Sequence, residues 1–417
     1  MNAPSASTTA SRRSTTVTPP GRAQRSLLAM LGRLSHGTLD LQTPSGLLHH
    51  FTGREDPASV RAALAVHDES VFARVLQHGD IGLAETFFEG AWTTPDLPAL
   101  LRLGLLNRES LERAIYGSRL ASIVYRALHL LRRNTRAGSR RNIHAHYDLG
   151  NSFYRLWLDP SMNYSSAWYA GDRSSSLQQA QQAKMGRALA EAGVTEGSRV
   201  LEIGCGWGAV AELAASRGAH LTGVTLSVEQ LDYARQRLAA AGLASRADLR
   251  LQDYRDLPAA GDAPFDAIVS IEMFEAVGRE YWASYFETVK RCLAPEGRAC
   301  IQTITVRDDL FERYVRGTDF IQQYVFPGGL LPSPAVFRAE AARAGLAIER
   351  ELAFGPDYAH TLRLWRHAFL QQLPQVRALG FDTRFVRLWE FYLAYCEAAF
   401  DAGSTDVVQF TLRHAHR

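Results

Sequence analysis

The 417-residue chain has few cysteines and no long apolar run, and each absence excludes a class of protein. Its cysteines, Cys205, Cys292, Cys300 and Cys396, are too few and too scattered for a disulfide framework or a CxxC metal site. No stretch approaches the roughly 18 to 20 apolar residues that a membrane-spanning helix requires. We therefore expect a protein of the reducing cytoplasm with no metal site and no membrane-spanning segment.

The N-terminus has almost no large apolar side chains. Residues 1 to about 25 are rich in Ser, Thr, Pro and Arg, a composition that is typical of a disordered tail. The pair Arg12-Arg13 is followed by Ser-Thr-Thr-Val-Thr-Pro-Pro, which is not an apolar signal core. We therefore expect no secretory signal.

Lysine is almost absent, and one stretch has no acidic residue. Only Lys184 and Lys290 are lysines among 46 basic residues, and the net charge is only +3.

Between Glu112 and Asp148 no residue is acidic, while arginine recurs at Arg119, Arg126, Arg132, Arg133, Arg136, Arg140 and Arg141. Apolar residues at helical spacing predict a basic helical linker over 116–140 that lies on anionic phospholipid. A solvated helix face is the alternative. Nucleic acid is not expected as a partner, because no recognition module is present.

The length of the chain predicts about two domains. Residues 26–115 are expected to form a small α+β accessory domain that presents lipid. Leu39 and Leu41 suggest a short strand, while 83–92 and 97–106 are expected to be helices, the first closed by Gly90. No catalytic constellation is found in this part.

Residues 141–417 are expected to form a second domain, in which helices and strands alternate from about 175 to 310. Strands are expected at 199–203, 220–224, 247–251, 265–269 and 298–304, with helices at 177–192, 208–217, 228–241 and 281–293. This order predicts an α/β fold with a Rossmann-like, doubly wound and mostly parallel sheet. Ligands of such a sheet bind at the carboxyl ends of its strands.

A glycine-rich turn follows the first of these strands, in Leu201-Glu-Ile-Gly-Cys-Gly-Trp-Gly208. Glycines at a strand-to-helix turn let the backbone approach a nucleotide-like ligand closely. With Ala209 and Glu229 the motif also satisfies the dinucleotide fingerprint, so an NAD-dependent dehydrogenase is an alternative. The acidic Glu202 before the glycines favours S-adenosylmethionine. The third interpretation is that the glycines only form a tight turn and bind no nucleotide.

Polar groups follow the next two strands. Thr225 and Gln230 are placed to bind a ribose or a carboxylate, although Ser227 and Gln230 also have the spacing of a helix cap. Gln252 and Asp253 lie where an adenine is expected, with a solvated loop as the alternative.

Ordered motifs in the C-terminal two thirds carry a resemblance to a known family. They are His146–Asn151, Met162–Ala167, Gln182–Lys184, the glycine turn, Gly223–Ser227, Leu251–Leu257, Met273–Gly278 and Tyr324–Ser333. In these motifs the chain resembles the cyclopropane-fatty-acyl-phospholipid synthases. The resemblance is close over about 140–400 and looser at Gly79–Gly82 and Gly90–Trp92.

The resemblance implies a class I methyltransferase that uses S-adenosylmethionine to convert the cis double bond of an unsaturated phospholipid acyl chain into a cyclopropane. It implies an enzyme peripherally associated with the inner face of the cell membrane, and a possible homodimer. With the glycine motif it implies the following cofactor residues: Tyr164, Ser165, Gly204, Gly206, Gly208, Thr225, Leu226, Gln230, Gln252, Asp253 and Ile271.

Ring closure needs a base, because methyl transfer to an alkene leaves a carbocation. The resemblance implies that bicarbonate is this base and that it is held by Glu275, Tyr358, Ser166, Gln302 and the backbone of Ile304. The family's commonest pattern has Cys at 166 and His at 302. Ser and Gln still donate hydrogen bonds, but the pocket is less cationic. This leaves open a methyl-branched or methylene product, or a non-catalytic lipid- or cofactor-binding homologue. Glu275 as a helix cap and Tyr358 as a loop anchor are the structural alternatives.

Aromatic and apolar residues recur at helical spacing between Thr361 and Phe400. They are Leu364, Trp365, Phe369, Phe391, Tyr392, Tyr395 and Phe400. Core packing is expected for most of them. Some are expected to line an acyl tunnel, because a lipid chain requires a long apolar pocket.

Overall fold

The computed structural model describes residues 21–112 and 149–415. The expected basic helix over 116–140 and most of the expected tail lie outside these residues. The helix α1 begins at Arg22, so the tail was predicted a few residues too long at its end. Within the described ranges, no helix has the length and apolar character needed to cross a membrane.

The N-terminal domain is a four-stranded sheet with helices, in the strand order β2-β1-β3-β4. Its elements are α1 (Arg22–Leu31), β1 (His36–Gln42), β2 (Leu48–Thr52), β3 (Asp56–Val66), α2 (Ser70–His78), α3 (Asp80–Phe88), β4 (Trp92–Thr93) and α4 (Leu97–Leu106). In β1 the buried Leu39 and Leu41 flank the exposed Asp40, so one face of the sheet is apolar.

The helix α4 has the predicted bounds, because Asp96 caps it by accepting a hydrogen bond from the Ala99 amide. The helix predicted over 83–92 is instead α3. It begins at Asp80 because Gly79, with φ 64°, ends α2, and the carboxylate of Asp80 suits a helix N-terminus. It ends before Gly90, and Trp92 belongs to a strand.

The C-terminal domain is built on a seven-stranded sheet in the order β10-β11-β9-β8-β5-β6-β7. Its central strands are β5 (Arg199–Ile203), β6 (His220–Thr225), β7 (Ala247–Leu251), β8 (Phe265–Ile271) and β9 (Leu293–Val306), and these are parallel. Strand β11 (Thr405–His414) lies between β9 and the edge strand β10 (Leu346–Ala353) and is antiparallel to both. The predicted Rossmann-like, mostly parallel sheet is confirmed.

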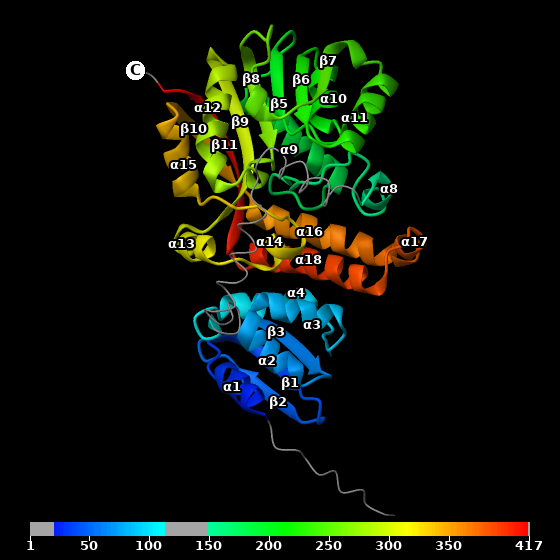
Figure 1. Ribbon diagram of the computed structural model, residues 1–417, viewed down its shortest axis with the longest axis vertical. Coiled ribbons are helices and arrows are strands. Elements are labelled where there is room, and N and C mark those ends of the chain that lie inside the picture. Colours follow the sequence, from blue (N-terminus) through cyan, green and yellow to red (C-terminus); the bar gives the residue numbers. More distant parts are fainter. Residues whose placement is uncertain (1–20, 113–148, 416–417) are drawn as a thin grey trace, which may run out of the picture.

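Helices cover both faces of this sheet (Figure 1). They are α9 (Leu177–Glu191), α10 (Ala209–Ser216) and α11 (Val228–Ala240) on one face, and α12 (Trp282–Cys292) and α15 (Pro334–Arg343) on the other. The short elements are α8 (Asn151–Tyr154), α13 (Asp308–Arg316), α14 (Phe320–Tyr324) and α17 (Leu373–Ala378), with 3₁₀ turns η1 (Ala244–Arg246), η2 (Tyr254–Asp256), η3 (Phe274–Ala276) and η4 (Arg279–Tyr281). Adjacent residues of β5 enter opposite cores, Val200 on one face and Leu201 on the other.

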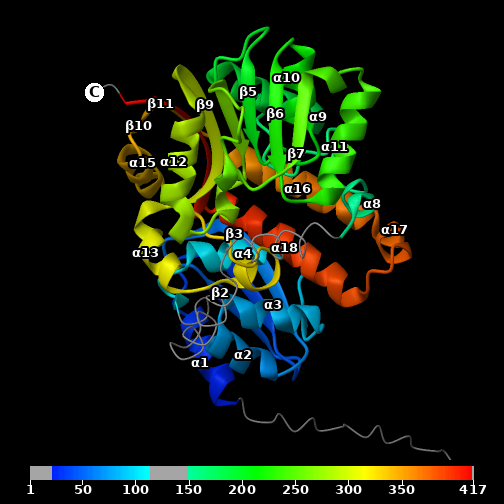
Figure 2. The same ribbon diagram turned by 45° about the horizontal axis from the view of Figure 1, so that its top comes forward.

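Two long helices, α16 (Gly355–Gln371) and α18 (Thr383–Asp401), lie between the sheet and the N-terminal domain (Figures 1 and 2). Phe391 of α18 packs on Phe87 and Phe88 of α3, with ring centroids 5.8 and 6.1 Å apart. One hydrophobic core therefore runs from the N-terminal domain into this helical layer. The carboxyl ends of the parallel strands face the same layer, which places a ligand site there.

Candidate active site

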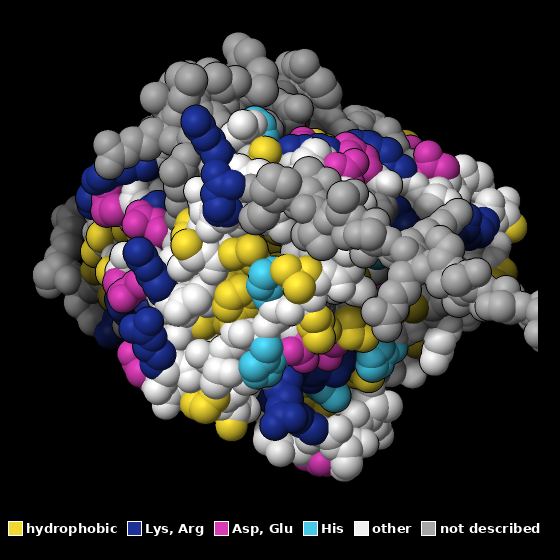
Figure 3. Space-filling model, turned by 90° about the horizontal axis from the view of Figure 1, so that it is seen from below, with side chains coloured by type: hydrophobic (Ala, Val, Ile, Leu, Met, Phe, Trp, Pro, Cys, Tyr) yellow, Lys and Arg dark blue, Asp and Glu magenta, His cyan; other side chains and the backbone are white. Residues whose placement is uncertain are grey.

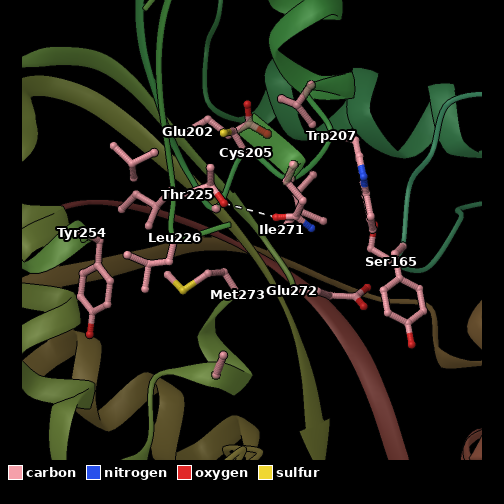
Figure 4. Close-up of a pocket in the computed structure, with 18 of the residues that line it drawn as sticks. Ser165, Glu202, Cys205, Trp207, Thr225, Leu226, Tyr254, Ile271, Glu272 and Met273 are labelled. Carbon is pink, nitrogen blue, oxygen red and sulfur yellow. Dashed lines mark hydrogen bonds between the residues drawn. The ribbon is translucent and has the colours of Figure 1, made fainter. Parts of the chain in front are cut away.

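A cavity opens at the carboxyl ends of β5, β6 and β8 (Figure 4). Ten of the eleven residues predicted to bind the cofactor line it: Tyr164, Ser165, Gly204, Gly206, Thr225, Leu226, Gln230, Gln252, Asp253 and Ile271. The eleventh, Gly208, does not. The sequence motifs that follow separate strands are therefore brought to one cavity by the parallel sheet.

The glycines of the turn after β5 serve two different purposes. Gly206 has φ 48°, and no atom lies within 4 Å of the position that a Cβ would take, so the backbone there faces open space. Gly208 has φ 81°, and a Cβ there would lie 2.8 Å from the Cβ of Ala234 on α11. Gly208 thus allows α10 and α11 to pack closely, and it does not line the cavity. The position of Gly208 therefore does not support the prediction that it binds the cofactor.

The end of β6 satisfies both interpretations of its sequence. The Ser227 hydroxyl accepts a hydrogen bond from the Gln230 amide at 3.2 Å and caps α11. The Gln230 side chain is left to accept a hydrogen bond from the Thr225 hydroxyl at 3.2 Å, on the cavity wall. After β7, the carboxylate of Asp253 is paired with Arg255 at 2.6 Å. Asp253 thus lines the cavity as one half of an ion pair, which sequence reasoning did not predict.

Glu202 gives the cavity wall an unpaired acidic group. Its Oε2 atom is buried and has no hydrogen-bond partner among the described residues. Burial raises the pKa of Glu202 well above its usual value. An orphaned buried carboxyl oxygen beside the open backbone at Gly206 fits a cofactor that carries hydroxyl or ammonium donors.

A second cavity, mainly apolar, adjoins the first. It is lined by residues of α14, α16 and α18 and of the loop after α14, among them Ile321, Phe326, Leu330, Leu331, Leu362, Tyr392, Tyr395 and Phe400. Tyr164, Glu272 and Ala276 line both cavities. Of the aromatic residues predicted for core or tunnel, Trp365, Phe369 and Phe391 are buried in the core, while Tyr392, Tyr395 and Phe400 line this cavity.

Glu272 lies at the junction of the cavities, directly after β8, and sequence reasoning did not single it out. Its Oε1 atom accepts hydrogen bonds from the Ser166 amide at 2.8 Å and from Gln302 Nε2 at 2.7 Å. Its Oε2 atom accepts one from the Tyr358 hydroxyl at 2.6 Å. In Figure 4 its side chain extends toward Ser165. An acidic residue at the carboxyl end of a parallel strand was the available signal.

The five residues predicted to hold bicarbonate meet around two glutamates instead. Ser166, Gln302 and Tyr358 bind Glu272, while the Ile304 amide donates to Oε1 of Glu275 at 2.5 Å. Ser166 acts through its backbone, since its hydroxyl donates to the Ala167 carbonyl. These donors are occupied by carboxylates of the chain, so the residues do not fit a bicarbonate ion. That the five residues hold bicarbonate stays a prediction, and this arrangement does not favour it.

Three comparisons with known proteins agree with this geometry. The family model described as "Mycolic acid cyclopropane synthetase" matches residues 134–410. The chain belongs to this family. It is 40% identical to the tuberculostearic acid methyltransferase UfaA1 of Mycobacterium tuberculosis, over 87% of this chain and 85% of that one. It is 35% identical to the cyclopropane-fatty-acyl-phospholipid synthase of Escherichia coli, over 84% and 87%. A crystal structure of mycolic acid cyclopropane synthase CmaA1 with SAH and CTAB superposes with a TM-score of 0.60, at 34% identity over 66% of this chain and 97% of that one.

Membership in the cyclopropane synthetase family makes this chain an S-adenosylmethionine-dependent methyltransferase that acts on lipid acyl chains. Family membership therefore excludes two alternatives from the sequence analysis, the NAD-dependent dehydrogenase and the non-catalytic homologue. The exact product is not decided by family membership, because relatives of both product classes match most of the chain.

The electrostatics of this family member's site separate its two glutamates. Burial, and then the charge of Glu272, raise the pKa of Glu275 to about 8, so Glu275 holds its proton at neutral pH. Its Oε2 atom is buried without a partner among the described residues, while Oε1 accepts hydrogen bonds from Ile304 and Thr303. The carboxyl group of Glu275 thus binds β9. No side chain caps η3 or the helix α12 that follows, so the helix-cap alternative is wrong.

Burial also raises the pKa of Glu272, but Tyr358, Lys184, Ser166 and Gln302 act in the opposite direction. Lys184 is fully buried, and its Nζ atom donates to the Ser165 hydroxyl at 2.5 Å. Burial lowers the pKa of Lys184 to about 8. Of the two glutamates, Glu272 is the one whose carboxylate receives hydrogen bonds from three donors and lies in the field of the Lys184 ammonium group.

Proposed function

We propose that this enzyme transfers the methyl group of S-adenosylmethionine to the cis double bond of an unsaturated acyl chain in phospholipid and closes a cyclopropane ring. The observation that carries the proposal is the junction of two cavities at Tyr164, Glu272 and Ala276. One cavity has the glycine turn and polar groups that suit a nucleoside, and the other is apolar, as an acyl chain requires.

The names of the relatives support this assignment. The Escherichia coli relative is a cyclopropane-fatty-acyl-phospholipid synthase, and the CmaA1 structure was solved with SAH and CTAB. S-adenosylmethionine supplies an electrophilic methyl group on a sulfonium. The residues of the chain have three tasks: to align this methyl with the alkene, to exclude water from the carbocation that forms, and to remove one proton. The buried, aromatic walls of the second cavity suit the first two tasks.

A methylene or methyl-branched chain is the second candidate product. The observation in its favour is the 40% identity to a tuberculostearic acid methyltransferase over most of both chains. The two products share the methyl transfer and the carbocation. They differ in what precedes the loss of a proton from the new methyl group. Ring closure takes that proton directly, whereas a hydride shift first moves the cation to the methylated carbon, so that the same proton loss gives a methylene group, which a reductant must saturate to give a methyl branch.

The test is to express the enzyme in a host that lacks its own synthase and to analyse the phospholipid fatty acids by mass spectrometry. A gain of one CH₂ unit on monounsaturated chains is expected, and fragmentation then separates a ring from a methylene or branched product. The variant Gly206→Val, which fills the cofactor cavity, serves as the negative control. An unchanged profile together with measured binding of S-adenosylhomocysteine would move the assignment to another methyl acceptor.

We further propose that the N-terminal domain carries the enzyme to the inner face of the cell membrane from the cytoplasm. Leu48 begins the second strand of its hairpin, β2, and Leu47 directly precedes it; the two side chains are 65% and 53% exposed. Figure 3, which views the molecule from the side of the N-terminal domain, shows hydrophobic side chains beside basic and histidine side chains. Exposed leucines near cationic groups suit an anionic phospholipid surface.

Vesicle binding tests this role. Replacing Leu47 and Leu48 with Ser is expected to weaken sedimentation with anionic phospholipid vesicles by about tenfold, because apolar area no longer enters the lipid. The control is Leu379→Ser, since Leu379 is 45% exposed on the other domain. Equal binding by the double variant and the wild type would remove the hairpin from the proposal. Changing Arg119, Arg126, Arg132 and Arg133 to Gln tests the basic stretch in the same assay.

A further inference from the structure

We propose that Glu272 is the general base of the reaction and that the chain therefore supplies its own carboxylate and does not require bicarbonate. The inference rests on the proposed function and deepens it by naming the group that takes the proton. Glu272 is the carboxylate that faces both the cofactor cavity and the apolar cavity. A base at this junction lies beside both the transferred methyl and the alkene.

The contacts of Glu272 hold its carboxylate ready to accept a proton. Hydrogen bonds from the Ser166 amide, Gln302 Nε2 and the Tyr358 hydroxyl, at 2.6 to 2.8 Å, fix both oxygens. Burial and the charge of Glu272 keep the pKa of Tyr358 well above its usual value, so the phenol remains a donor. Three donors from separate elements surround one side chain, as an anion site would be built.

The charges that face Glu272 come from two further elements. Lys184 on α9 provides a buried ammonium group that favours the ionised carboxylate. Glu275 in η3 also faces Glu272, and a negative charge on Glu275 would disfavour ionisation of Glu272. Because burial and the charge of Glu272 raise the pKa of Glu275, Glu275 keeps its own proton. Two carboxyl groups with separated protonation states provide one base and one neutral neighbour.

A relay of side chains sets the orientation of the Gln302 amide. The guanidinium of Arg187 donates to Oε1 of Gln409, which leaves the Gln409 Nε2 atom to donate to Oε1 of Gln302 at 2.9 Å. Gln302 must then present its Nε2 atom to Glu272. Because arginine has only donors, the order of donors and acceptors along this chain is fixed.

The backbone of Glu272 is held in an uncommon conformation. Its φ is 49°, in the left-handed region that residues with a Cβ avoid. Such strain persists where the surrounding structure holds it and is found often at functional sites. Here the backbone is restrained by the hydrogen bond that the Glu272 amide donates to the Gln302 carbonyl at 2.8 Å and by the three hydrogen bonds of the side chain.

The proton transfer balances as follows. The π electrons of the alkene form a bond to the methyl carbon while the C–S electron pair stays on sulfur, which yields S-adenosylhomocysteine and a carbocation. Glu272 takes a proton from the new methyl group, and the C–H electron pair forms the third bond of the ring. The proton of Glu272 returns to solvent after the product leaves. No other reactant is needed.

The test compares wild type and Glu272→Gln on vesicles of unsaturated phosphatidylglycerol, in carbon-dioxide-free buffer and with added bicarbonate. The wild-type rate is expected to be the same in both buffers. Glu272→Gln is expected to lower kcat by about 100- to 10,000-fold. Affinity for S-adenosylhomocysteine, measured by calorimetry, should stay within about threefold, which shows that the variant is folded. The exposed Glu296→Gln is the matched control and should keep full activity.

Glu272→Gly provides a second variant, because glycine readily adopts the left-handed backbone of this position. It leaves the three donors facing a space of carboxylate size. We expect an inactive enzyme that added bicarbonate or formate partly rescues. A wild-type rate that falls in bicarbonate-free buffer, or a Glu272→Gln variant with near-normal kcat, would overturn the inference. A wild type that binds S-adenosylhomocysteine but modifies no phospholipid in either buffer would overturn the proposed function itself.

Discussion

Tyr358 donates a 2.6 Å hydrogen bond to Glu272, although the two residues are 86 positions apart in the chain. Tyr358 is on α16, in the helical layer between the N-terminal domain and the sheet, and Glu272 directly follows the strand β8 of the sheet. The contact therefore joins the layer that lines the apolar cavity to the sheet that holds the cofactor cavity. Loss of this hydrogen bond should therefore lower kcat more than it lowers the free energy of unfolding.

Tyr358→Phe is expected to reduce kcat about 10- to 100-fold and to shift the pH profile. A hydrogen bond donated to a carboxylate lowers its pKa, so removing the donor raises the pKa of Glu272. Because the base must be ionised, the acidic limb of the kcat profile should move to higher pH. Kinetics between pH 5.5 and 9 measure the shift. An unshifted profile would show that Tyr358 acts only by packing.

Gln409→Met is expected to weaken catalysis without touching either cavity directly. Gln409 lines neither cavity, and its loss frees the Gln302 amide to turn its oxygen toward Glu272. We expect kcat to fall about 3- to 10-fold, the KM for S-adenosylmethionine to stay constant and the acidic limb to move upward. Arg187→Lys keeps a donor to Gln409 and should retain more activity than Arg187→Met. Equal losses in the two Arg187 variants would argue against the relay.

The two glycines of the turn after β5 should respond differently to substitution by alanine. Gly208→Ala is expected to cost about 2–4 kcal/mol of unfolding free energy, because it adds left-handed strain to a clash with Ala234. Below its Tm it should bind S-adenosylhomocysteine almost normally. Gly206→Ala should cost only about 1 kcal/mol but weaken that binding tenfold or more, since its methyl enters the cavity. Urea unfolding measures the unfolding free energy, and calorimetry measures the affinity for S-adenosylhomocysteine. If Gly208→Ala weakened binding and Gly206→Ala mainly lowered stability, the roles assigned to the two glycines would be reversed.

Asp80 should make the stability of the domain contact depend on pH. Its Oδ2 atom accepts hydrogen bonds from the Tyr395 hydroxyl at 2.7 Å and the Phe320 amide at 3.2 Å, across the boundary between the domains. Burial, and then the charge of Asp319, raise its pKa to about 7. A raised pKa in the folded state means that stability is fully present below about pH 4 and is lost as pH rises through 7.

The variant Asp80→Asn removes this dependence. The unfolding free energy of wild type minus that of Asp80→Asn is expected to fall by about 1–3 kcal/mol between pH 4.5 and pH 8. Urea unfolding at both pH values measures it, and the exposed Asp56→Asn is the control, which should show no such trend. A difference that does not change with pH would mean that Asp80 is ionised in the folded protein.

The cofactor cavity was largely predictable from the sequence because its parts are local. A strand, a turn and the start of a helix carry Gly204, Gly206, Thr225 and Gln230, and a parallel sheet gathers such turns at one edge. Strand β5 and helix α4 were predicted with the observed bounds because alternation and capping act within a few residues. Gly208 was misassigned because its neighbour Ala234 lies on another helix.

Only the tertiary structure showed which carboxylate lies at the junction of the two cavities. Glu272 meets the Ser166 amide across 106 positions and Gln302 across 30, and its left-handed backbone is visible only in coordinates. The sequence determined that the chain has a nucleoside-binding turn, a parallel sheet and the family's motifs, since these are set by near neighbours. Which donors surround which oxygen depends on side chains that packing brings together from distant segments, and for that reason the sequence pointed to bicarbonate where the fold places Glu272.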